Sequence, residues 1–146
     1  MGGHDLRRRC RQQPRHGLAH AAADERPCDF VLGQADVDGL DHNRGAYHPT
    51  AGALSMPYGL TVLGGRLTVA DTANSRLLGY GPDGIAPGAA ARWLAGQWRF
   101  TDKGDNRWLP MTRDSLCWPY GVAACGDTLV IADSGNNRVL LWRAAP

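Results

Sequence analysis

The sequence repeats itself after 62 residues, and this repeat restricts the possible folds more than any other feature. Residues 57–80 align with residues 119–142 without a gap, and ten of the 24 aligned positions are identical. The identical residues are Pro57, Tyr58, Gly59, Gly64, Leu67, Ala70, Asp71, Asn74, Arg76 and Leu78. A repeat of this kind predicts two copies of one structural unit, each burying its apolar faces against its neighbour.

A weaker match precedes each copy. Leu32-Gly33-Gln34 corresponds to Leu94-Ala95-Gly96-Gln97 with one inserted residue, and Asn43-Arg44 corresponds to Asn106-Arg107. We therefore divide the chain into a first repeat, residues 28–92, and a second repeat, residues 93–146.

Each copy has the pattern of short β-strands. Residues 59–63 form an apolar run after a Pro-x-Gly turn, and residues 67–70 form a second strand. A connection over residues 71–75 then leads to a last strand that ends at Tyr80. The second copy follows the same pattern, and its residues 129–132 are all apolar, which predicts a strand covered on both faces. We expect an all-β fold of antiparallel sheets.

A set of polar residues recurs at the end of the second strand of each copy. Aspartate can accept hydrogen bonds from the backbone of a turn, and asparagine tolerates the left-handed conformation. Arginine offers a planar fork for a carboxylate or for several carbonyl groups. A catalytic group is normally unique, so we assign these repeated residues to the architecture and expect no catalytic residue. With the turn residues, this signature comprises Pro57, Gly59, Asp71, Asn74, Arg76, Pro119, Gly121, Asp133, Asn136 and Arg138.

The combined pattern P-Y-G-[LV] … L-[TV]-[VI]-A-D-x-x-N-x-R-[LV]-L resembles the NHL repeat, a unit of β-propellers, over roughly residues 30–143. The L-G-Q element is similar to a bacterial subgroup with V-L-G-Q-x-D-F before each P-x-G. Val37 departs from that pattern in the first copy, and the inserted Ala95 and Arg99 depart from it in the second. The resemblance implies a partial β-propeller of two NHL-type blades that serves as a scaffold for a protein or another ligand.

Two blades are fewer than a closed propeller needs, since closed rings use about 4–8 blades. We expect the sequence to be a fragment of a longer propeller gene, or a misread one. The rival hypothesis is that several chains assemble into one ring.

Residues 1–27 differ in composition from the rest of the chain. Arginine is frequent there, and the apolar stretch of a secretory signal is missing. We expect this basic segment to be unstructured or non-native, for instance translated out of frame. With no signal segment and no run of about 18 apolar residues, we expect no membrane span and take the cytoplasm as the default compartment.

Aromatic and basic residues are concentrated in the connection over residues 98–118. Loops on a rigid β scaffold commonly bind ligands, and aromatic residues and arginine are enriched at interface hot spots. Packing of the tryptophans between blades or over an edge is the simpler explanation of this density, and binding of a protein partner is the functional one. The candidate binding residues are Trp98, Arg99, Arg107, Trp108 and Trp118.

Two other function classes stay open. Some relatives with NHL-like propellers are lyases or lactonases with a central metal, and here only the loop with His42 and His48 offers ligands. A solvated acidic loop is the simpler explanation of that segment, so we expect no metal and no cofactor. Some NHL propellers bind RNA, but the formal net charge of +2 argues against a nucleic-acid surface.

Overall fold

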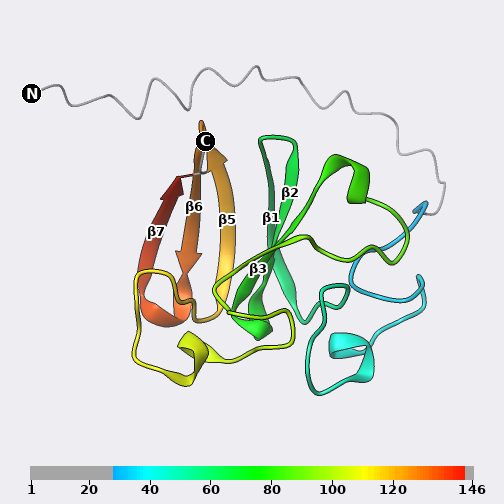
Figure 1. Cartoon of the computed structure of the whole chain (residues 1–146), viewed down its shortest axis with the longest axis horizontal. Helices are drawn as coiled ribbons and strands as arrows, with labels where there is room; N and C mark the ends of the chain where they lie inside the picture. Colours follow the sequence, from blue (N-terminus) through cyan, green and yellow to red (C-terminus); the bar gives the residue numbers. More distant parts are fainter. Residues whose placement is uncertain (1–27, 144–146) are drawn as a thin grey trace, which may run out of the picture.

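The computed structural model describes residues 28–143, which form two antiparallel sheets joined by long loops (Figure 1). The first sheet contains, in spatial order, β1 (Pro57–Leu63), β2 (Arg66–Asp71), β3 (Arg76–Tyr80) and β4 (Trp93–Ala95). The second sheet contains β5 (Pro119–Cys125), β6 (Thr128–Asp133) and β7 (Arg138–Arg143). The remaining elements are 3₁₀ turns: η1 (His42–Gly45), η2 (Thr72–Asn74), η3 (Pro82–Gly84), η4 (Asp105–Trp108) and η5 (Ser134–Asn136).

The expectation of an all-β fold with antiparallel sheets is confirmed. Within residues 28–143 no α-helix is present, and accordingly none that could cross a bilayer. The basic segment predicted over residues 1–27 lies outside the described residues.

The sequence repeat is also a structural repeat. Pro57 pairs with Asp71 across β1 and β2, and Pro119 pairs with Asp133 across β5 and β6. A register shift follows the proline in both hairpins. Because β4 pairs with β3 of the first sheet, residues of the second sequence repeat complete the sheet of the first.

The two sheets pack against each other, with β1 beside β5 (Figure 1). The core between them contains Ala70 and Leu77 of the first sheet and Val122 and Ile131 of the second, together with Leu116. A second core covers the other face of the first sheet and contains Leu54, Val69, Leu78, Tyr80 and Ala91. The first sheet is therefore a middle layer.

The prediction that residues 129–132 are covered on both faces is wrong. Ile131 is buried, but Val130 and Ala132 are only half-buried. Val139, on the neighbouring strand, is 60% exposed. The physical reason is that, among the described residues, nothing packs on the face of the second sheet that points away from the first.

Both long connections lie at the same end of the molecule, opposite the β1–β2 and β5–β6 turns (Figure 1). They also repeat each other: Asn43 and Arg44 in η1 have φ values of 53° and 56°, and Asn106 and Arg107 in η4 have values of 52° and 62°. The backbone N–H of Asn43 donates to the Leu54 carbonyl at 2.9 Å, and the backbone N–H of Asn106 donates to the Leu116 carbonyl at 2.8 Å. The repeated unit thus includes the connections as well as the strands.

Tyr80 offers a test of the first core. Its hydroxyl is buried and has no hydrogen-bond partner among the described residues. Because an unsatisfied buried hydroxyl is costly, we expect Tyr80→Phe to raise the free energy of unfolding by about 1–2 kcal/mol at pH 7. Urea denaturation followed by tryptophan fluorescence measures this change, and a loss of stability would contradict it.

The same substitution has a pH signature. Burial, reinforced by the Asp71 charge, raises the pKa of Tyr80 from 10.0 to about 12. The unfolded chain therefore loses this proton at lower pH than the folded chain does, so Tyr80 destabilises the fold as pH rises from about 10 to 12. Tyr80→Phe removes this contribution, and its stability should fall less steeply over that range.

Candidate functional site

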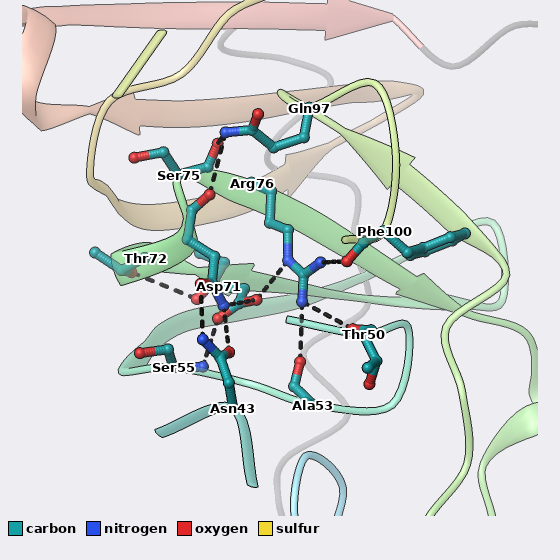
Figure 2. Close-up of polar contacts among 12 residues, drawn as sticks. Asn43, Thr50, Ala53, Ser55, Asp71, Thr72, Ser75, Arg76, Gln97 and Phe100 are labelled. Carbon is teal, nitrogen blue, oxygen red and sulfur yellow. Dashed lines mark hydrogen bonds and ion pairs between the residues drawn. The ribbon is translucent and has the colours of Figure 1, made fainter. Parts of the chain in front are cut away.

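A buried carboxylate lies at the end of β2, where the sequence signature begins (Figure 2). One oxygen of Asp71 accepts the Ser55 amide at 2.7 Å. The other accepts Asn74 Nδ2 at 2.8 Å and Arg76 Nε at 2.6 Å. Burial raises the pKa of this carboxyl group, and the Arg76 charge and the three hydrogen bonds oppose that rise. The carboxylate thereby joins the loop before β1 to the β2–β3 turn.

Arg76 extends this network to two loops (Figure 2). Its Nη2 donates to the carbonyls of Thr50 and Ala53, each at 3.0 Å, and its Nη1 donates to the carbonyl of Phe100. The side chain has no solvent exposure. One guanidinium group therefore holds both long connections against the end of the first sheet.

The second copy repeats the carboxylate cluster. Asp133 accepts the Cys117 amide at 2.7 Å, Asn136 Nδ2 at 2.8 Å and Arg138 Nε at 2.6 Å. Arg138 Nη2 donates to the carbonyls of Thr112 and Ser115. Within residues 28–143, no carbonyl takes the place that Phe100 has beside Arg76, and the Arg138 side chain is 22% exposed.

The recurring asparagines connect each loop to its cluster. Asn43 and Asn74 exchange side-chain hydrogen bonds of 3.2 and 2.8 Å, and Asn106 and Asn136 exchange bonds of 2.9 Å in both directions. The glutamine of the L-G-Q element acts alongside them: Gln97 Nε2 donates to the carbonyls of Asn74, Ser75 and Gly104. These side-chain amides therefore hold the two long connections in place.

A pocket of about 590 Å³ opens between the two long connections. Four of the five residues predicted to bind line it, namely Trp98, Arg99, Arg107 and Trp108. The first connection contributes Tyr47 and His48, and the second also contributes Gln97, Thr101, Asp102 and Lys103. We call these ten residues the inter-loop pocket.

Aromatic rings and cations alternate in the inter-loop pocket. Lys103 Nζ lies 3.6 Å from the centre of the Tyr47 ring, and the Arg107 guanidinium carbon lies 5.1 Å from that of the Trp98 ring. Arg107 is held at its far side by Asp114 at 2.9 Å. Trp108 stays 75% exposed. Large aromatic surfaces thus face solvent beside positively charged side chains.

The remaining candidates lie elsewhere. Trp118 is outside the inter-loop pocket, and its ring stacks on Tyr120 at a centroid distance of 6.4 Å. His42 Nδ1 lies 3.1 Å from the Ser55 hydroxyl, whereas His48 lines the inter-loop pocket and contacts the Tyr47 ring edge-on. Across residues 28–143, no group of three histidine, cysteine, aspartate or glutamate side chains could hold a metal ion.

The sequence interpretation missed six of the ten pocket residues, namely Tyr47, His48, Gln97, Thr101, Asp102 and Lys103. Tyr47 and Lys103 are far apart in the sequence and occupy different repeats. Only the aromatic character of Tyr47 could have been noticed, and nothing in the sequence indicates that it meets the second connection.

No protein-family model matches the sequence, and no curated protein matches it either.

Proposed function

We propose that this chain is an NHL-like propeller unit that acts as a binding scaffold for a protein partner, which it recognises through the inter-loop pocket. The observation that carries the proposal is the gathering of exposed aromatic rings and cations on two loops that the buried Arg76 side chain holds in place by hydrogen bonds. The volume of the inter-loop pocket is within the range of about 300–1,000 Å³ that is typical of ligand sites.

The charges of the pocket favour an acidic segment of the partner. Among the described residues, the side chains of Arg99 and Lys103 form no ion pair, whereas the Asp102 carboxylate accepts the Arg99 amide at 3.1 Å. Both cations are therefore available to carboxylates. Trp98 and Trp108 supply the apolar contact area that dominates interface hot spots.

The loops are suited to this role because their backbone is ordered before binding. Arg76 and Gln97 hold the second connection, and Arg44 Nε donates to the Gly33 carbonyl to hold the first. A preorganised site loses less conformational entropy when its partner binds. This supports recognition by the loops with the sheets as a frame.

The proposal is tested by selection from a displayed random peptide library on the immobilised full chain. We expect the enriched peptides to contain aspartate or glutamate next to apolar residues. Trp108→Ala should weaken their binding at least about tenfold, because removing a hot-spot tryptophan costs about 2 kcal/mol or more.

Trp118→Ala is the matched control, since Trp118 lies outside the pocket, and it should leave peptide binding unchanged. Equal affinity of wild type and Trp108→Ala for every enriched peptide would contradict the proposal. So would selective binding of single-stranded RNA with a steep salt dependence, which is typical of nucleic-acid partners.

A further inference from the structure

The two sheets of one chain provide a template for an interface between chains. The same repeat position is covered in one copy and open in the other: Val122 is 8% exposed and its counterpart Leu60 is 70% exposed. On the opposite faces, Leu77 is 2% exposed and its counterpart Val139 is 60% exposed. Leu77 and Val122 belong to the core between the sheets, so Val139 and Leu60 are the two unused halves of that same contact.

The second sheet also lacks the pairing that completes the first. In the first sheet, Leu77 pairs with Ala95 and Leu78 pairs with Leu94 of β4. Among residues 28–143, β7 has no strand on its outer edge. Aligning Gly33 with Gly96 makes residues 30–32 the counterpart of β4, and these residues belong to no strand in the described chain.

Residues 30–32 lie against the first sheet in the way that β4 lies against the second sheet. Ala95 of β4 packs against the core between the sheets, and its counterpart Leu32 packs against the other core of the first sheet. Leu116 would meet a Cβ added at Gly96, and Leu54 would meet one added at Gly33. The segment therefore has the position of a fourth strand without a sheet to complete.

Among the described residues, Gln34 and Arg138 also donate fewer hydrogen bonds than their counterparts in the other repeat. Gln97 donates to Asn74, Ser75 and Gly104, whereas Gln34 donates only to Asp41, the counterpart of Gly104, within the described chain. In the same way, Arg76 reaches the Phe100 carbonyl, and Arg138 has no equivalent partner there. The counterpart of Phe100 in the first repeat is Val37.

Within residues 28–143, the hydroxyl group that follows β2 or β6 is also used between sheets in one repeat and not in the other. Thr72 Oγ1 donates to the Pro119 carbonyl at 2.7 Å and thereby links the two sheets. The counterpart hydroxyl of Ser134 reaches only the Ala132 carbonyl of its own strand, at 3.3 Å. Pro57, the counterpart of Pro119, is exposed.

We infer that a second copy of this chain docks head to tail on the second sheet. Residues 30–32 of that copy pair with the edge of β7, and its Leu60 packs against Val139. Its Val37 carbonyl accepts from Arg138, and its Pro57 carbonyl accepts from Ser134. Leu60 and Val139 are both apolar, and they correspond to Val122 and Leu77, the two sides of the existing contact between the sheets. Repetition of the step closes a ring, and because rings of such sheets contain about 4–8 sheets, the ring has about two to four copies.

The mass of the full chain in solution, measured by light scattering and by sedimentation, tests this inference. We expect one species of two to four chains of 15.7 kDa each, and a single chain at the highest soluble concentration would overturn the inference. That outcome would show instead that the open faces stay bare or are covered by residues 1–27. Because this measurement uses the unmodified chain, its result does not depend on whether any variant folds.

Two blocked variants test the head-to-tail orientation. Val139→Lys blocks one face and Leu60→Lys blocks the other, and both positions are exposed within the single chain. We expect each variant alone to be a single chain and an equimolar mixture of the two to form a one-to-one complex, since one face of each stays open. Self-association of either variant, or no complex in the mixture, would overturn the inference.

The pocket variant Trp108→Ala separates this inference from the proposed function. It should weaken peptide binding and leave the mass unchanged. Val139→Lys should lower the mass and leave peptide affinity per chain unchanged, so each idea can fail without the other.

Discussion

Replacing Arg76 by methionine should lower the free energy of unfolding by about 3–5 kcal/mol, because it leaves the Asp71 carboxylate buried without its cation. The two groups are 2.6 Å apart and neither is exposed to solvent. The carbonyls of Thr50, Ala53 and Phe100 lose their donor in the same step. Since domains are stable by only about 5–15 kcal/mol, a large fraction should be lost, as measured by urea denaturation.

Arg138→Met is the internal control for this experiment. Arg138 makes the same 2.6 Å contact with Asp133, which is as buried as Asp71, but the Arg138 side chain is 22% exposed, so water can reach the carboxylate through the space that the arginine leaves. We expect a loss of about 2 kcal/mol or less, intermediate between an exposed and a buried pair. Both variants are compared at concentrations at which the chain is a monomer. Equal losses would show that burial does not determine the effect.

Gly59→Ala should cost about 3 kcal/mol, at the upper end of the range for overpacked sites. A Cβ at this position would lie 2.8 Å from the Val122 amide nitrogen and 3.0 Å from the Tyr120 carbonyl oxygen. Both are backbone atoms, which cannot turn away as a side chain can, so β1 and β5 must separate. A lowered midpoint of thermal or urea unfolding checks this expectation.

The counterpart substitution, Gly121→Ala, should change the stability of the monomer by less than about 1 kcal/mol. Its added Cβ would have the Ala132 Cβ at 3.5 Å as its nearest neighbour, an ordinary contact. The two glycines are identical in the sequence motif and differ only in what lies across from them. Similar losses in both variants would contradict a close approach of β1 to β5.

The strands could be predicted from the sequence because their signals are local. Alternating apolar residues and the Pro-x-Gly turns predict both hairpins, and the structure places β1, β2 and β3 at residues 57–80. The connections were harder to interpret, because their conformation depends on left-handed residues such as Asn43 and Asn106 and on bonds to partners about 30 residues away. No short-range pattern encodes such contacts.

The pocket was predicted in part for a related reason. Trp98, Arg99, Arg107 and Trp108 lie in one connection, so their density in the sequence indicated a common surface. Trp118 belongs to the same stretch but has a φ of 49° and stacks on Tyr120 instead. Tyr47 and His48 come from the first connection, and only the packing of the two sheets brings them to the other residues.

By itself, the sequence determined the repeated unit, its antiparallel strands and the polar residues at the end of β2 and β6, since each depends on neighbours within a few tens of residues. Only the tertiary structure decided which copy of each residue is covered. Leu60 and Val122, or Leu77 and Val139, have the same place in the motif, yet their exposure differs because burial depends on what packs across the sheet and not on the chain segment itself.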